Sequence, residues 1–167
     1  MTASRARRVP RLTLSVQYAV AADALPKPAA LRRWARAALE RDAVVALRFV
    51  GTREGRTLNA FYRGKDCATN VLTFVYDDMM PVEGDLVLCA PVLRHEARAQ
   101  GKRLADHCAH LVVHGMLHLQ GYEHDTDRDA RAMEARERTV LAQFDIADPY
   151  RAPRAAPVRP ASHAAAR

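Results

Sequence analysis

Three histidines in the second half of the chain have the spacing of a metal site. The segment from His114 to His124 reads HGMLHLQGYEH, which has the form HxxxHxxGxxH. Residues four apart on a helix project from one face about one turn, ~6 Å, apart, so His114 and His118 can converge on one ion. Gly121 can adopt the left-handed conformation that ends a helix, which brings His124 in as a third ligand. Three histidines leave a position of a zinc ion open for water or substrate, as in catalytic zinc sites.

The same pattern leaves two alternatives to be weighed. Two histidines four apart in a helix can also form a partly buried polar pair, and the turn glycine and the third histidine are what favour metal binding. Zinc peptidases instead carry HExxH, in which the Glu takes a proton from the metal-bound water. Gly115 occupies that position here, so a zinc peptidase would lack its general base.

Two more histidines precede the pattern on the same helical face. His107 and His110 lead to His114 in steps of three and four residues. Because three histidines already complete the protein's share of an open zinc site, we do not expect either to be a ligand. We interpret His110 as a packing residue or as a partner of a ligand, and we expect His107 to lie at the surface.

Glu137 lies on the otherwise apolar face of a predicted last helix, where a carboxylate is costly unless it is paired. It could contact a ligand histidine or Arg63. Equally, it could reach water at the edge of the helix and pair with Arg136 or Arg138. The sequence leaves both interpretations open.

Hydrophobic patterns predict the elements that must position these residues. Alternating or β-branched runs predict strands at 12–20, 44–50, 71–76 and 84–89. Helical patterns with Pro and Gly boundaries predict helices at 29–40, 91–100, 104–119 and 127–144, and the segment 53–61 can be helical. We therefore expect an α+β fold with a small mixed sheet of about four strands covered by helices. The 104–119 helix should form one wall of a cleft.

The chain length and the distribution of charge predict one domain with two basic tails. A chain of 167 residues with 49% hydrophobic residues can bury one core. The net charge is +7, but residues 1–11 and 151–167 hold eight of the 26 basic residues and no acidic ones. We predict a disordered basic arm at 1–11, one domain at 12–150, and a disordered Ala/Pro-rich tail at 151–167. The tails could be solvated linkers or RNA-binding arms.

Cysteine usage and hydropathy favour the cytoplasm. Cys67, Cys89 and Cys108 are an odd number without a CxxC pair, so neither a disulfide framework nor a thiolate metal cluster is indicated. The apolar residues of 12–20 alternate with polar ones, unlike the continuous apolar run of a signal peptide. No stretch reaches transmembrane length, so we expect no membrane partner.

Two long motifs resemble the YbeY family of endoribonucleases. The segment 114–124 is similar to the family's HGxLHLxGYDH, and Met133 and Glu137 match the MxxxE that follows it. The segment 62–74, YRGKDCATNVLTF, is similar to the family's YRGKDxxTNVLSF, and the resemblance covers roughly residues 44–141. Glu123 stands where the family usually has Asp, and Thr73 where it usually has Ser.

The resemblance implies a zincin-like fold and one zinc ion per chain, held by His114, His118 and His124. It also implies cleavage of single-stranded RNA, a role in 3′-end maturation of small-subunit ribosomal RNA and in ribosome quality control, and contacts with the ribosome or small-subunit assembly factors. Arg63 stands at the position of the family's functionally important arginine, and its planar two-donor fork suits a phosphate as a catalytic residue. The alternative is a non-catalytic ribosome-assembly module that binds RNA and keeps a structural metal. The open three-histidine site favours the enzyme.

Overall fold

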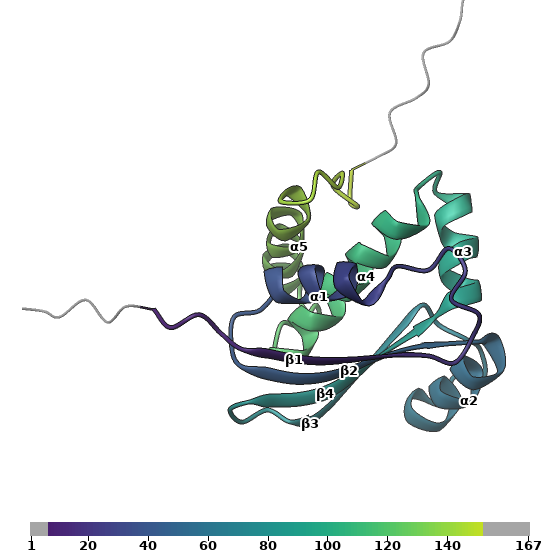
Figure 1. The fold of residues 1–167 in the computed structure, drawn as a ribbon, viewed down its shortest axis with the longest axis horizontal. Helices are drawn as coiled ribbons and strands as arrows, with labels where there is room; N and C mark the ends of the chain where they lie inside the picture. Colours follow the sequence, from purple (N-terminus) through teal and green to yellow (C-terminus); the bar gives the residue numbers. More distant parts are fainter. Residues whose placement is uncertain (1–6, 152–167) are drawn as a thin grey trace, which may run out of the picture.

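The computed structural model describes residues 7–151, which form a four-stranded sheet packed against helices (Figure 1). The strands are β1 (Leu12–Tyr18), β2 (Ala43–Val50), β3 (Val71–Asp77) and β4 (Val82–Cys89). The helices are α1 (Pro28–Ala37), α2 (Thr52–Arg63), α3 (Ala90–Ala99), α4 (Leu104–Leu119) and α5 (Asp127–Ala142). The predicted α+β class with a small mixed sheet is confirmed.

The sheet is parallel except at one edge. Its strand order is β1-β2-β4-β3, with β1, β2 and β4 parallel and β3 antiparallel to β4. Parallel neighbours need a crossover connection, and α1 supplies it between β1 and β2. Among the described strands, β3 pairs with β4 alone. It is therefore an edge strand, and no other strand pairs with its outer side.

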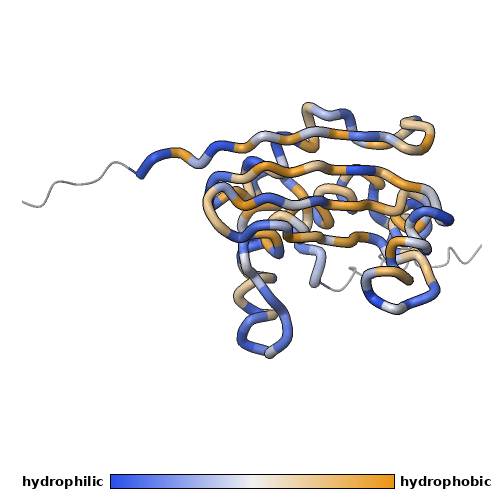
Figure 2. The backbone as a smooth tube through the Cα atoms, turned by 90° about the horizontal axis from the view of Figure 1, so that it is seen from below, coloured by the Kyte–Doolittle hydropathy of each residue, from blue (hydrophilic) through white to orange (hydrophobic). Residues whose placement is uncertain are grey.

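Most helices cover one face of the sheet, and α2 lies on the other side at one end (Figure 1). Figure 2 shows the four strands side by side. Apolar and polar residues alternate along β1, because successive side chains point to opposite faces, whereas β2 is apolar at nearly every position. The main core lies between the sheet and α1, α4 and α5, and a smaller cluster lies beneath α2. The main core includes Leu47, Phe49, Leu86, Leu88, Val113, Met116 and Leu117; the smaller one is Val50, Leu72, Val87 and Cys89.

Helix α4 approaches strand β4 closely at Gly115. A Cβ atom at this position would lie 2.6 Å from Cδ2 of Leu86, closer than side-chain carbons tolerate. The absence of a side chain therefore lets the helix press against the sheet. This contact sets the distance between β4 and the helix that carries the histidines.

Several boundaries differ from the predicted ones. Helix α1 ends at Ala37, three residues before the predicted end, and α2 runs on to Arg63, where the sequence suggested only a short helical segment. Gly64, with φ of +68°, ends α2 in the left-handed conformation. Arg63 is thus the last residue of a regular helix.

The last residues of the predicted basic arm contact the domain. Within residues 7–11, the Arg8 guanidinium pairs with Asp42 at 2.8 Å, and the backbone N–H of Arg11 donates to the same carboxylate at 2.8 Å. Residues 1–6 and 152–167, which include most of the two predicted tails, lie outside the described residues. Among the helices of the described part, none is long and apolar enough to cross a membrane.

Candidate metal centre

The three histidines of the HxxxHxxGxxH motif converge at the end of α4. His114 and His118 lie one turn apart on the helix, and His124 comes from the segment that follows it. Gly121, with φ of +97°, reverses the chain, and the N–H of Tyr122 donates to the carbonyl of Leu117 at 3.1 Å. This is the left-handed helix ending that the sequence predicts.

The geometry and the protonation of the three histidines fit a metal ion. One ring nitrogen from each lies within 4.8 Å of the others, and a tetrahedral zinc ion would hold its nitrogens about 3.4 Å apart, so small side-chain rotations close the site. Burial, and then the charges of His114 and His124, lower the pKa of His118 to about 4. His118 is therefore neutral near pH 7, which is the form that binds metals.

Glu137 of α5 is fully buried behind His114. The N–H of His114 at Nδ1 donates to Oε1 of Glu137 at 2.5 Å, which leaves the Nε2 lone pair of His114 free for a metal. Burial raises the pKa of Glu137, but hydrogen bonds from His110, His114 and Tyr150 outweigh it and lower the pKa to about 2. Of the two interpretations left open, the contact with a motif histidine is therefore the one observed.

Two further side chains share the other oxygen of Glu137. His110 donates from Nε2 to Oε2 at 3.2 Å, which makes it a partner of the same carboxylate rather than a packing residue only. The Tyr150 hydroxyl also donates to Oε2. Its ring lies under the Arg138 guanidinium, and Arg138 pairs with Asp148 at 3.0 Å. Tyr150 could not be predicted from the sequence, because it follows α5 in an irregular segment.

His107 is not at the surface, as the sequence had suggested, but buried with 3% of its area exposed. Its Nε2 lies 2.7 Å from Oε2 of Glu96 in α3, and the side-chain amide of Asn70 donates to the same carboxylate at 3.2 Å. The prediction was wrong because α3 provides a buried partner for His107, the carboxylate of Glu96, and the sequence pattern of α4 alone does not show this contact. The contact ties α4 to the start of β3.

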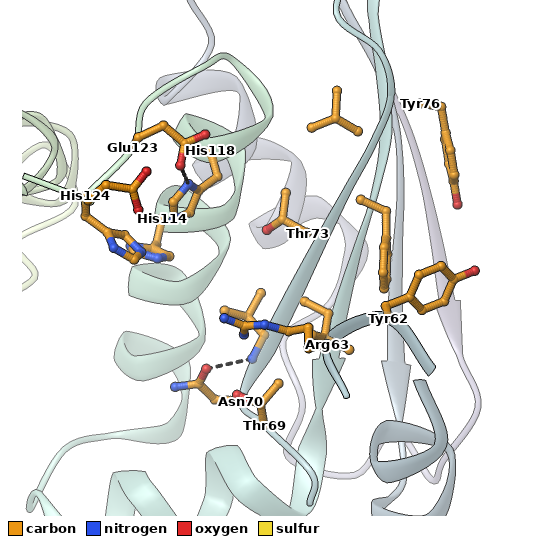
Figure 3. A pocket seen from close by; sticks show the side chains of 15 residues that line it. Tyr62, Arg63, Thr69, Asn70, Thr73, Tyr76, His114, His118, Glu123 and His124 are labelled. Atoms are coloured by element: carbon orange, nitrogen blue, oxygen red, sulfur yellow. Dashed lines mark hydrogen bonds and ion pairs between the residues drawn. The ribbon is translucent and has the colours of Figure 1, made fainter. Parts of the chain in front are cut away.

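A cavity of about 810 Å³ brings the histidines and Arg63 together (Figure 3). Arg63, at the end of α2, and the three histidines all line it. Within residues 7–151, no carboxylate lies within ion-pair distance of Arg63. The cavity could therefore hold a ligand in contact with an unpaired guanidinium and a bound metal at once. Its other polar lining residues are Tyr62, Thr69, Asn70, Thr73, Tyr76, Glu123 and Asp125.

The carboxylates near the motifs take other roles. Oε2 of Glu123 lies 3.8 Å from Nδ1 of His118, too far for a hydrogen bond but close enough for a charge interaction. Asp66 forms a two-pronged ion pair with Arg56 at 2.6 and 2.7 Å. Oδ1 of Asn70 accepts from the N–H of Val71 at 2.7 Å, a local bond at the start of β3.

Comparison with known proteins identifies the family of this chain. A family model described as Endoribonuclease YbeY matches residues 23–145. A relative from Azoarcus sp. (strain BH72) named Endoribonuclease YbeY is 54% identical over 156 residues, which cover 87% of this chain and 62% of the longer relative. One of the same name from Aromatoleum aromaticum is 54% identical over 143 residues, covering 84% of this chain and 93% of the relative.

A solved structure supports the fold independently. The solution structure of a protein from Thermotoga maritima superposes with a TM-score of 0.52 at 21% sequence identity, covering 84% of this chain and 99% of the other. At that identity the likeness concerns the fold alone. The family match and the identities of its relatives, on the other hand, leave one assignment: this chain belongs to the YbeY family of endoribonucleases.

Proposed function

We propose that this chain is a zinc-dependent endoribonuclease that cleaves single-stranded RNA and takes part in the maturation of small-subunit ribosomal RNA. The observation that carries the proposal is the shared cavity, in which three histidines with convergent nitrogens and an unpaired arginine face the same space. The family assignment supports an RNA substrate. The RNA-processing role and any ribosomal partner rest on the family resemblance.

His114, His118 and His124 are the proposed ligands of one zinc ion per chain. Three imidazole nitrogens suit zinc better than magnesium or calcium, which prefer oxygen ligands. Zinc bound there supplies Lewis acidity toward the phosphodiester and its attacking oxygen. Glu137 holds the ring of His114 in one tautomer and one orientation, so Nε2 faces the metal position.

Arg63 is the proposed catalytic residue that binds the scissile phosphate. Its guanidinium offers two parallel N–H donors, which match two oxygens of a phosphodiester. Negative charge grows on those oxygens as the attacking oxygen adds and the leaving oxygen departs. A fixed cation at this position lowers the energy of that transition state more than that of the bound substrate.

The alternatives are weaker on specific grounds. In a non-catalytic module with a structural metal, four protein ligands would normally close the site, yet the three histidines open on a large cavity. In a zinc peptidase a glutamate would follow the first histidine, and Gly115 stands there. A ribosome-associated enzyme acting in the cytoplasm is the role that we propose.

Metal analysis and an RNA cleavage assay on one preparation test the proposal. We expect about one zinc per chain, cleavage of a single-stranded RNA, loss of cleavage with a chelator, and recovery on addition of zinc. The same strand annealed to its complement is the matched control and should be cut far more slowly. Full activity in protein shown to be free of metal would contradict the proposal.

A further inference from the structure

Two tyrosines line the cavity although more than half of each side chain is in water. Tyr62 is 57% exposed and Tyr76 66% exposed, and both border the cavity that the histidines and Arg63 share. An exposed large aromatic residue bordering a functional cavity is a frequent sign of ligand contact.

Both rings are held in place by neighbours. The ring of Tyr62 packs against Phe74 of β3, with centroids 4.5 Å apart. The Tyr76 hydroxyl donates to Oδ2 of Asp85 at 2.5 Å, and this bond raises the pKa of Tyr76 to about 12. The two rings are therefore oriented before any ligand arrives, which reduces the entropy lost on binding.

The charge of the cavity excludes binding by the phosphate backbone alone. Among its described lining residues, Arg63 is the single Lys or Arg, and Glu123 and Asp125 are acidic. Proteins that bind nucleic acid mainly through its phosphates use several Lys or Arg side chains along a groove. Beyond Arg63 and the proposed metal ion, the described lining offers the phosphates no cation, so other contacts must add to the affinity, and the exposed tyrosine rings offer them.

The tyrosines lie on the face of β3 that is turned away from the histidines, with Phe74 and Asp85, and the cavity runs around the unpaired edge of this strand. Figure 3 shows the three histidines on the left, Tyr62 and Tyr76 on the right, and Arg63 with Thr73 between them. An RNA strand with one phosphate at Arg63 and the metal position can pass around the edge of β3 and bring a neighbouring base against the rings. The cavity volume, about 810 Å³, is in the range of sites that enclose small ligands.

We propose that Tyr62 and Tyr76 form a tyrosine platform on which an unpaired base of the RNA substrate stacks, next to the scissile phosphate. This proposal rests on the proposed function, and it explains why the enzyme would prefer single-stranded RNA. Bases in a duplex stack on their neighbours and leave no face free, whereas an unpaired base can stack on an aromatic side chain.

Binding of a short single-stranded RNA that carries the fluorescent base 2-aminopurine tests the platform without relying on cleavage. Tyr76→Ala should weaken binding about tenfold, Tyr62→Ala by a similar factor, and Tyr76→Phe should recover most of the loss because it keeps the ring. Met79→Ala is the matched control, since Met79 is 70% exposed nearby on the same hairpin but does not line the cavity. Wild-type affinity in both alanine variants would overturn the proposal.

A series of RNAs, each lacking one base, locates the contact. At one position, removal of the base should cost as much as Tyr76→Ala, and the two losses should not add, because both remove the same contact. Strictly additive losses at every position would overturn the platform. Melting temperatures of the variants should stay close to wild type. If the platform binds but the wild-type protein cuts no RNA, the proposed function fails and the platform stands.

Discussion

The two walls of the cavity differ in how firmly their functional side chains are held. On the α4–α5 wall, His114 is fixed by a fully buried carboxylate, Glu137, that accepts hydrogen bonds from three side chains. On the α2–β3 wall, Arg63 and the tyrosine platform are exposed, and no ion pair engages Arg63 among the described residues. The first wall is prepared for a small ion that needs strict geometry, and the second keeps its charge and rings free for a large, flexible ligand.

The contrast predicts different consequences for substitutions in each wall. Changes in the α4–α5 wall should lower metal affinity and stability together, since the same hydrogen bonds serve both. Changes in the α2–β3 wall should alter RNA cleavage or binding while leaving the metal and the fold unchanged. Each variant below tests that separation.

The largest effect is expected for His118→Ala. Two remaining histidines make a poor zinc site, so zinc should fall from about one per chain to nearly none, and cleavage should fall with it. Inductively coupled plasma mass spectrometry measures the metal. His95→Ala, which changes an exposed histidine outside the site, is the control and should keep full occupancy. Full zinc retention in His118→Ala would show that the ligand assignment is wrong.

Arg63→Lys should reduce cleavage of single-stranded RNA on the order of 10²-fold, because lysine keeps the charge but loses the two-donor fork. Zinc content and melting temperature should match wild type. A cleavage time course, metal analysis and circular dichroism on one preparation provide the comparison. Wild-type cleavage by Arg63→Lys would remove the proposed phosphate contact from the mechanism.

Glu137→Gln should weaken zinc binding by about 10- to 100-fold, as expected when the partner of a ligand histidine is changed. The amide has nearly the same shape, but its NH₂ group would face one of the three donors that now meet a carboxylate. Competition with a chromogenic chelator measures the affinity. Glu134→Gln on the same helix is the control, and equal affinities in the two variants would contradict the role of Glu137.

The metal-free protein should lose stability as the pH falls from about 6.5 to about 4. The folded-state pKa of His118 is lowered to about 4 from 6.5, so the unfolded chain binds more protons in that window, and acid favours unfolding there. The loss should reach up to about 3 kcal/mol. A second loss should follow between about pH 4.5 and 2, where Glu137 is protonated in the unfolded chain but still ionised in the folded protein. Chemical denaturation across this range should show a flatter upper step in His118→Ala.

The smallest effect is expected for Tyr150→Phe. It removes one of three donors to Glu137 and leaves the ring under Arg138, so zinc affinity should fall only a few-fold and stability by about 1 kcal/mol. Thermal unfolding and chelator competition would detect both. A loss of zinc affinity as large as that of Glu137→Gln would mean that Tyr150 does more than donate one of three hydrogen bonds to Glu137.

The sequence was most informative where a contact depends on local spacing. The convergence of His114 and His118 follows from helical periodicity, and the turn at Gly121 follows from the glycine itself. Spacing could place Glu137 on a helix face and suggest a ligand histidine as one possible partner, but it could not choose among the candidates, because the partner lies on another helix. The burial of His107 depends in the same way on a neighbouring helix, α3, and the contact of the Tyr150 hydroxyl depends on irregular backbone after α5.

The close approach of α4 to β4 at Gly115 also limits which chemistries this scaffold can reach. Substitution of Gly115 by Glu would write the peptidase motif HExxH into the chain, yet its Cβ would already meet Leu86 at 2.6 Å. Either the fully buried Leu86 side chain or the helix that carries His114 and His118 would have to shift. A single substitution converts this sequence motif into HExxH, but the folded protein could accept it only if the core around Leu86 repacked.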